Sequence, residues 1–336
     1  MKHMNATTAN PPENAHPSAT SGLDVAVCII TLKRPHGLSR LLNSLQALTF
    51  EDASPAWCVV VVDNDAQGSA QSIVEEAREG FPVPIIYGQE PLKGIAAARN
   101  TAVRLAPACR FIAFIDDDEV ADPRWLDQLL RTQKTYQADI VTGPVLPDFE
   151  SPPPRWIVRG KLFDRRRLPT GTQIHYAATH NTLVKYEWTQ KLEGPFDMRF
   201  NLTGGSDSQF TRRVIQNGGK IIWADEALVT EYNPPSRTTA AWLLQRAFRI
   251  AFTTTLIEKQ LYPLGIVLLR PVKAVYHILL GIALILPLFV YYGYAGIIKA
   301  LQRVARGVGA LFALFGGHYE EYAQKASSPA NSDTPS

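Results

Sequence analysis

The sequence predicts an α/β fold in which a mostly parallel sheet is flanked by helices. Two observations support this prediction. Short apolar runs alternate with segments whose apolar residues recur at helical spacing, from residue 25 to about residue 223. Several of these runs contain no polar residue, which is typical of strands buried on both faces of a parallel sheet. Hydrophobic residues make up 46% of the 336 residues, which allows a sizeable core.

Each predicted element rests on a local pattern. Strands are short apolar runs such as Val59–Val62, and helices are segments with apolar residues three or four apart, as from Leu38 to Leu45. The predicted strands cover 25–30, 59–62, 84–87, 111–116, 140–142, 179–184 and 220–223. The predicted helices cover 38–45, 73–79, 94–105, 123–136, a segment capped by Ser206 and ended by Gly218 and Gly219, and 238–260.

Residues 147–170 interrupt this alternation. Prolines at 152–154 form a stiff segment, and three arginines follow at 165–167. Charge runs usually face water, which would make this stretch a solvated surface loop. The alternative is a lid over an anionic ligand, and the sequence leaves both interpretations open.

The apolar run 111–115 leads directly into three aspartates and a glutamate at 116–119. Open α/β sheets bind ligands beyond the carboxyl ends of their strands, where these acids would lie. Their repulsion raises pKa values, and a hard divalent cation would remove it. The stretch therefore predicts Mg²⁺ or Mn²⁺ holding a diphosphate. The alternative is an acidic surface turn before a helix that begins near residue 122.

Parallel topology should bring four loops to one edge of the sheet. They follow the strands that end at residues 30, 62 and 115, and the fourth surrounds Lys93 and Gly94. We expect these loops to bind a nucleotide in parts, because the sequence contains no GxxxxGK[ST] loop for phosphate. The chemistry-bearing residues of the four loops are Thr31, Arg34, Asp63, Arg99, Asn100, Asp116, Asp117 and Asp118.

The last third of the chain has a different composition. Residues 278–294 carry no charge, and this length is the short limit for spanning a bilayer. Tyrosines lie near both ends, and lysines and arginines flank both sides, as at a membrane surface. We expect a re-entrant or in-plane membrane hairpin, or one hydrophobic span near 275–296. The alternative is a core helix of a soluble protein.

Charge and cysteine content restrict the class of protein. The net charge is only +3, so no global polyanion binder is implied, and no nucleic acid partner is expected. Three widely spaced cysteines in apolar runs suit buried thiols better than disulfides or a zinc site. The polar termini, 1–22 and 321–336, predict disordered tails, and the first lacks the apolar core of a secretory signal.

Six stretches in a fixed order carry a resemblance to a known family. They are the opening strand with Thr31 and Arg34, Val61-Val62-Asp63, Gly94 to Asn100, Phe114-Ile115-Asp116-Asp117-Asp118, Gly205-Ser206-Asp207, and Gln245-Arg246-x-x-Arg249. With this order and spacing, residues 25–260 resemble a family 2 glycosyltransferase with a GT-A fold. The acids match the DXD motif of that family. Within the family, the chain is most similar to bacterial exopolysaccharide enzymes of the succinoglycan type.

The resemblance implies a role for each matching residue. The implied nucleotide-sugar contacts are Thr31, Arg34, Asp63, Lys93, Arg99, Asp116, Asp117, Asn181, Arg246 and Arg249. The implied metal ligands are Asp118 and Asp116, and the implied general base is Asp207. The sequence departs from the family pattern where Ser206 replaces the usual Glu and where no Trp follows Arg249. For Asp207 the alternative role is that of an acid favoured by the dipole at a helix start.

The resemblance, with the apolar carboxyl region, implies an inverting, metal-dependent transfer of a hexose. The expected donor is a nucleotide sugar, and a UDP-sugar is preferred. The acceptor would be a lipid-linked saccharide or polysaccharide in cell-surface polysaccharide biosynthesis. The reaction would take place at the cytoplasmic face of the plasma membrane. The alternatives are a sugar-nucleotide nucleotidyltransferase, although residues 30–35 lack the glycines of its phosphate loop, and a non-catalytic membrane-attached binding protein. The expected domains are 23–260, divided into a nucleotide-sugar half at 23–145 and an acceptor half at 146–260, and membrane-associated helices at 261–320.

Overall fold

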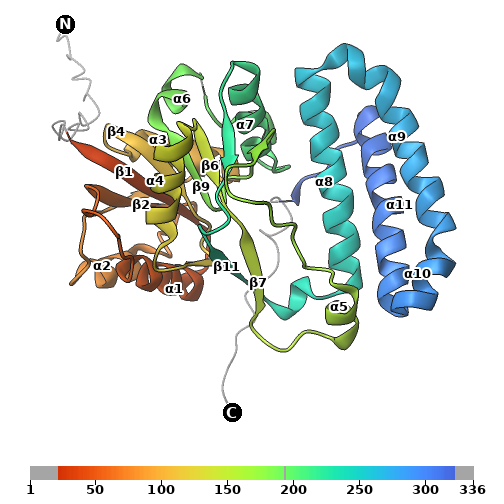
Figure 1. Ribbon diagram of the computed structural model, residues 1–336, viewed down its shortest axis with the longest axis horizontal. Coiled ribbons are helices and arrows are strands. Elements are labelled where there is room, and N and C mark those ends of the chain that lie inside the picture. Colours follow the sequence, from red (N-terminus) through yellow and green to blue (C-terminus); the bar gives the residue numbers. More distant parts are fainter. Residues whose placement is uncertain (1–21, 193, 322–336) are drawn as a thin grey trace, which may run out of the picture.

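The computed structural model describes residues 22–192 and 194–321, without the side chains of 263–268. The tails predicted at 1–22 and 321–336 lie outside this range, apart from Gly22 and Glu321. Figure 1 shows two neighbouring parts, a sheet with helices on both faces and a group of four helices, α8 to α11, of which α10 is short. The fold is the predicted α/β class, with a mostly parallel sheet flanked by helices.

Within the described residues, the main sheet has eight strands in the order β3-β2-β1-β4-β9-β6-β10-β8. Strands β1 to β4, β6 and β10 are parallel, whereas β9 and β8 run antiparallel to their neighbours. The strands are β1 (Leu23–Thr31), β2 (Trp57–Asp63), β3 (Ile85–Gln89), β4 (Cys109–Phe114), β6 (Ile140–Thr142), β8 (Gln173–Ile174), β9 (Thr182–Lys185) and β10 (Ile221–Trp223).

Alternate residues of β1 enter two different cores, because successive side chains of a strand point to opposite faces. Val25, Val27 and Ile29 pack with one set of helices, and Ala26 and Cys28 with the other. The first set is α1 (Pro35–Gln46), α2 (Gln71–Arg78) and α4 (Trp125–Tyr136). The second set is α3 (Ile95–Leu105), α6 (Tyr186–Lys191) and α7 (Ser206–Gln216).

A second, three-stranded sheet holds the segment that follows the acids. Its order is β5-β11-β7, with β5 (Glu119–Ala121), β11 (Val229–Asn233) and β7 (Val145–Phe149). The strand predicted at 111–116 is therefore too long: β4 ends at Phe114, and the acids lie in the turn to β5. The three-residue β5 carries no readable alternation, so only its pairing with β11 defines it.

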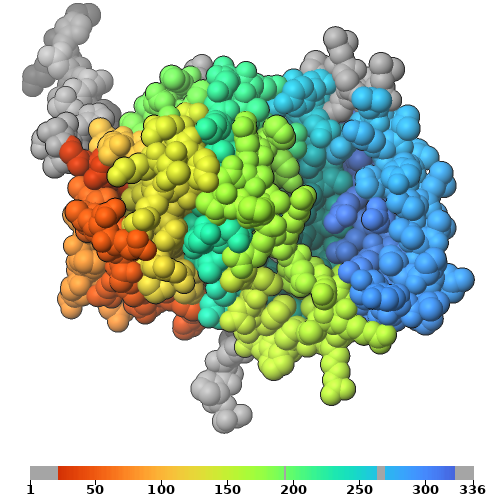
Figure 2. Space-filling model, in the orientation of Figure 1, coloured from red at the N-terminus to blue at the C-terminus, as the bar shows by residue number. Residues whose placement is uncertain are grey.

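The segment predicted as a solvated loop or lid contains structure. It begins within β7 and includes α5 (Arg155–Gly160), whose Trp156 ring packs on Tyr294 at 5.2 Å. Figure 2 shows this green segment lying against the blue helical part. Arg165 pairs with Glu231, and the Nε of Arg167 donates to Asp225 Oδ1 at 2.9 Å. Two of the three arginines thus tie the segment to β11 and to the turn after β10.

The helical part consists of α8 (Ala240–Leu261), α9 (Pro263–Ala283), α10 (Ile285–Tyr292) and α11 (Tyr294–Leu314). Glycines let α11 approach its neighbours closely: a Cβ on Gly309 would lie 2.3 Å from the Phe248 carbonyl oxygen, and one on Gly307 2.5 Å from that of Ala274. Among the described helices, none alone is long and apolar enough to cross a bilayer. By length and composition only, the pair Leu269–Ala283 and Ile285–Tyr292, bent by 51°, passes that test.

Two asparagines fix the loops at the carboxyl edge of β2 and β3. Asn64 donates to the carbonyls of Glu90 and Leu92 and accepts from Gly94 N at 2.8 Å. Asn201 accepts from Ala97 N at 2.9 Å, and its amide donates to the Lys93 carbonyl. Gly94 sits between them with a φ of 138°. The loop that carries Lys93 is therefore held from both sides.

We expect Gly94→Ala to lower the free energy of unfolding by about 3 kcal/mol. The strained backbone costs about 1–2 kcal/mol, and a new Cβ would lie 2.2 Å from the Asn201 side chain, displacing its two hydrogen bonds. Gly80→Ala is the matched control, because Gly80 also has a positive φ, 83°, but no atom within 4 Å of the Cβ position. Urea unfolding of both variants tests this, and equal losses would contradict it.

Candidate active site

The acids at 116–119 form a closed turn between β4 and β5. Glu119 N donates to the Asp116 carbonyl at 3.1 Å, and Asp116 N donates to Glu119 Oε2 at 3.0 Å. The turn is tied to the second sheet because Tyr232 N donates to the Asp118 carbonyl at 2.9 Å. Burial, together with the charge of Asp116, raises the pKa of Glu119 well above its usual range. Backbone hydrogen bonds thus fix the shape of the turn and hold the Glu119 carboxylate in it.

Asp117 points to the end of β1. Its two oxygens accept from Thr31 Oγ1 and from Arg34 Nη1, both at 2.8 Å. Burial raises the pKa of Asp117 to about 6, although the Arg34 charge opposes this rise. The predicted neighbours Thr31 and Arg34 therefore lie at the acids, and they anchor the turn to β1.

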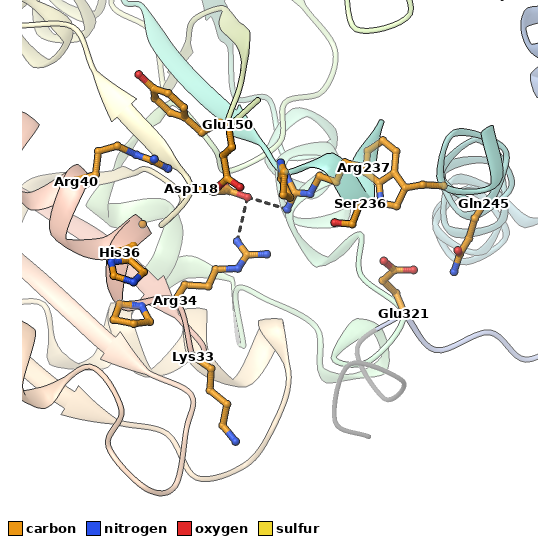
Figure 3. Close-up of a pocket in the computed structure, with 15 residues that line it drawn as sticks. Lys33, Arg34, His36, Arg40, Asp118, Glu150, Ser236, Arg237, Gln245 and Glu321 are labelled. Atoms are coloured by element: carbon orange, nitrogen blue, oxygen red, sulfur yellow. Dashed lines mark hydrogen bonds and ion pairs between the residues drawn. The ribbon is translucent and has the colours of Figure 1, made fainter. Parts of the chain in front are cut away.

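Asp118 is held by two arginines. Its Oδ2 accepts from Arg34 Nη1 at 3.0 Å and from Arg237 Nη2 at 2.8 Å, as the dashed lines in Figure 3 show. Burial acts to raise the pKa of Asp118, but the two guanidinium groups hold it below its usual value. Arg237, at the end of the 3-10 turn η2 (Pro235–Arg237), also pairs with Glu231 at 3.0 Å. Neither Arg237 nor Glu231 was predicted, since no motif surrounds them.

Asp118 faces a cavity of about 530 Å³ between the start of α1 and α8. Basic side chains dominate its wall, and the aromatic rings of Tyr232 and Trp242 complete it. Such a lining suits an anionic ligand with a flat or apolar part. The charged or titratable lining residues are Lys33, Arg34, His36, Arg40, Asp118, Glu150, Arg237 and Glu321.

Asp116 faces a different set of groups. Its Oδ1 lies 3.6 Å from Nη2 of the buried Arg99 on α3. Burial raises the pKa of Asp116, Arg99 opposes the rise, and the charges of Asp118 and Asp207 add to it. Asp207, in the first turn of α7, is therefore within electrostatic range of the acidic turn. His180 also acts on Asp116, and its Nδ1 lies 3.8 Å from Glu119 Oε1.

The prediction that Ser206 caps α7 is wrong. Gly205, with a φ of 94°, is the N-cap, and Ser206 is the first helical residue. The Ser206 Oγ is buried without a hydrogen-bond partner among the described residues. Two consecutive glycines allow the left-handed backbone that turns the chain into the helix, so no side-chain cap is needed.

Asp63 and Asn181 are buried and internally bonded. Asp63 accepts from the backbone N–H groups of Asp65 and Ala70 at 3.0 and 2.7 Å, so it shapes the loop after β2. Asn181 donates both amide hydrogens to the carbonyls of Pro144 and Ala227 and accepts from Trp125 Nε1. Its amide hydrogens are thus used inside the protein, which indicates a positioning role instead of the predicted sugar contact.

The two arginines of the Gln245 motif have partners other than a diphosphate. Arg246 lies over the Trp242 ring at 5.2 Å, and burial with the nearby Arg165 charge lowers its pKa to about 10. Arg249 Nη1 lies 3.9 Å from Glu321 Oε1. Gln245 donates to Tyr319 Oη, which donates to Glu321 Oε2, both at 2.7 Å. The segment after α11 therefore returns to the mouth of the cavity.

The carboxylates of Asp116 and Asp118 are of the ligand type that a hard divalent cation prefers. Hard oxygen ligands two residues apart are what Mg²⁺ or Mn²⁺ needs when substrate phosphates complete the shell. Both arginines donate to Oδ2 of Asp118. Among the described residues, no cluster of three or more metal-ligating side chains exists, so the protein alone offers only a partial site.

Comparison with known proteins decides the family. The sequence profile of Glycosyl transferase family 2 matches residues 26–193. The chain belongs to this family. It is 34% identical over 233 residues to the succinoglycan biosynthesis protein ExoM of Rhizobium meliloti, covering 69% of this chain and 74% of that protein. A glucosyl-dolichyl phosphate glucuronosyltransferase of Haloferax volcanii is 25% identical over 72% of this chain and 78% of its own.

A solved structure supports the GT-A fold. The mannosyltransferase PcManGT from Pyrobaculum calidifontis, in complex with GDP-Man and Mn²⁺, superposes with a TM-score of 0.56 over 90% of this chain and 91% of its own. The sequences are 18% identical, so this likeness concerns the fold. Family 2 membership makes the chain a glycosyltransferase that takes its sugar from a nucleotide sugar, and it argues against a nucleotidyltransferase.

Asp117 should make the stability of the protein depend on pH. Its pKa of about 6 exceeds the ordinary 3.8, so between these values the folded protein binds more protons than the unfolded chain, and stability falls as pH rises. Relative to Asp117→Asn, the wild-type free energy of unfolding should fall by about 2 kcal/mol from pH 3.8 to pH 6. Urea unfolding with a chelator present measures this. A difference that is the same at both pH values would contradict it.

Proposed function

We propose that this family 2 enzyme is an inverting, metal-dependent hexosyltransferase. It would use a UDP-sugar and extend a lipid-linked saccharide or polysaccharide acceptor in cell-surface polysaccharide biosynthesis. One arrangement supports the proposal: Asp116 and Asp118 lie in one turn after β4, and Asp207 lies in the first turn of α7, within range for its charge to raise the pKa of Asp116. This supports roles as leaving-group site for the two aspartates and as base for Asp207.

The chemistry divides between the two sides of the turn. Asp116 and Asp118 would hold Mg²⁺ or Mn²⁺, which supplies positive charge to the departing diphosphate when bound. Asp207 accepts the proton of the acceptor hydroxyl. At the same time, the hydroxyl oxygen bonds to the anomeric carbon, and the bond between that carbon and the diphosphate oxygen breaks. One direct displacement inverts the anomeric centre. Arg99 lies beside Asp116, so its positive charge would offset the negative charge of the turn as charge develops on the departing diphosphate.

The donor nucleotide would occupy the loops that follow β1, β2 and β3. The proposed contacts are Thr31, Arg34, Asp63, Lys93 and Arg99, with Asp117 holding Arg34 in place. Asp63 is bonded to its own loop, so it would contribute chiefly by shaping that loop. Arg246 and Arg249 are proposed for the diphosphate side, where Arg249 would exchange Glu321 for phosphate oxygens.

A membrane-held acceptor agrees with the helical part of the chain. The bent pair α9 and α10 exposes large apolar side chains, and the relative named above is a succinoglycan biosynthesis protein. We therefore propose the cytoplasmic face of the membrane as the place of reaction, with α9 and α10 lying at the bilayer surface. The acceptor saccharide would then be presented near α8, which links the helical part to the cavity.

The first test is metal-dependent donor hydrolysis. Purified protein would receive UDP-glucose, UDP-galactose, GDP-mannose or dTDP-rhamnose with Mn²⁺, Mg²⁺ or a chelator, and released nucleoside diphosphate would be measured. We expect release from one UDP-sugar, abolished by the chelator and lowered about 100-fold in Asp118→Ala. If the chelator does not change the release of nucleoside diphosphate, the proposed role of the metal is wrong. If no nucleotide sugar binds at all, a non-catalytic binding protein becomes the better description.

The second test separates the two roles of Asp207. As general base, Asp207→Asn should lower kcat for transfer by about 10² to 10⁴ and leave the Kd for the donor unchanged. As a helix-start acid only, it would lower stability by about 0.3–1 kcal/mol and leave kcat intact. Ser208→Ala, in the same helical turn, is the control and should keep kcat. A full kcat in Asp207→Asn would remove the proposed base.

A further inference from the structure

A second basic pocket lies in the helical part, and nothing in the transfer reaction uses it. Its volume is about 190 Å³, and it is lined from α8, α9 and α11. It shares no lining residue with the cavity at Asp118. The lining residues are Ile250, Ala251, Thr254, Arg270, Lys273, Ala274, His277, Arg306 and Ala310.

The positive charge of this pocket is not balanced from within the protein. Among the residues that the structure describes, no acid lines the pocket or pairs with Lys273, Arg303 or Arg306. Only Arg270 has such a partner, with its Nη1 3.1 Å from Glu258 and its Nε donating to Thr255 Oγ1. Clustered like charges destabilise a fold, so their presence without acids indicates an external anion.

His277 adds a neutral donor or acceptor to the pocket. Its Nδ1 is buried and has no hydrogen-bond partner among the described residues. Burial and the charges of Arg303, Arg306 and Arg270 lower the pKa of His277, which disfavours the charged form of the ring. A buried polar atom without a partner costs free energy unless a ligand or water satisfies it.

The size and chemistry of the pocket select the anion. At about 190 Å³, it is smaller than the roughly 300 Å³ at which pockets for drug-sized molecules begin, so it fits a compact group. Arginine binds phosphate through two parallel N–H groups, and lysine adds a point charge. Apolar Ile250, Ala274 and Ala310 complete the wall. This combination suits a phosphate group attached to an apolar body.

An exposed apolar row lies directly beside the charged row of α9. The charged row is Arg270, Lys273 and His277, and the apolar row of Leu269, Val272 and Tyr276 occurs one residue earlier in each turn, about 100° around the helix. The apolar side chains are 59, 67 and 58% exposed. The apolar row continues through Leu279, Ile282, Leu286, Phe289 and Val290.

We propose that this pocket binds the phosphate group of a membrane lipid, whose apolar chains would lie against the exposed row of α9 and α10. Arg306 and Lys273 hold the phosphate oxygens, Arg270 is pre-positioned by Glu258, and His277 completes the site. Basic pockets between helices next to an apolar surface recognise lipid headgroups in this way. The inference does not depend on the glycosyltransferase activity, because it concerns a separate pocket.

The test is flotation of the full chain with vesicles of phosphatidylcholine, with or without phosphatidylglycerol. We expect binding to the anionic vesicles, lowered about tenfold by Arg306→Lys, which keeps the charge but loses the two-pronged contact. Lys273→Gln with Arg306→Gln should abolish it. The matched control is Arg104→Gln with Arg110→Gln, which removes the same charge from residues that are 70 and 71% exposed on the sheet part.

The outcomes separate the possible ligands. If the control pair loses as much vesicle binding as the Lys273 and Arg306 pair, or if Arg306→Lys binds as well as the wild type, general charge attraction explains the binding and the proposed site is wrong. Calorimetry with inorganic pyrophosphate and no vesicles distinguishes the source of the phosphate. If the wild type binds pyrophosphate, Arg306→Lys does not, and no vesicle is bound, the ligand is a free phosphate compound and the lipid proposal is wrong. If the protein is a stable dimer that binds neither kind of vesicle, a second copy of the chain covers the apolar row, and the lipid proposal is wrong. Circular dichroism confirms that each variant is folded.

Discussion

Four neighbouring carboxyl groups in one largely buried turn are the constraint on which the rest of the site depends. Asp117 and Glu119 are almost completely buried, and Asp118 is nearly so. Such a turn is stable only if cations and hydrogen-bond donors reach it from elsewhere in the chain. Arg34 and Thr31 come from the end of β1, Arg99 from α3 and Arg237 from η2. The acids therefore organise the loops around them.

The second sheet is part of this arrangement. Pairing of β5 with β11 places Glu231 beside Arg237, and Arg237 in turn contacts Asp118. The same strand leads through η2 into α8, which brings Trp242 and Gln245 to the cavity. Arg237 thus joins the acidic turn to the second sheet by ion pairs and lies 6.0 Å from the ring of Trp242 in the first turn of α8. A cation bound at Asp118 would have to share that carboxylate with both arginines.

The sequence predicts what is local and misses what depends on distant pairing. The buried strands and the acids at 116–118 were predicted, because apolar runs and adjacent carboxylates are visible within a few residues. Arg237 lies 119 residues from Asp118, and no pattern in its own segment marks it. Asn181 shows why the role of a polar residue at a strand end is hard to predict, since such a residue suits an internal hydrogen-bond role as well as a ligand contact. The family resemblance supplied its role, and the structure shows why that residue type is needed there.

The helical part gathers basic side chains around its own pocket, and this bears on its role. The whole chain has a net charge of +3, so Lys273 and Arg306 at the pocket, with Arg303 close enough to lower the pKa of His277, are a local concentration of charge. Close packing of α11 on α8 and α9 at Gly307 and Gly309 forces these side chains together. Folding alone would favour acids between them, as Glu258 is placed for Arg270. Their absence among the described residues leaves an external phosphate as the group that balances the cluster, and the apolar row beside it places that phosphate at a lipid surface.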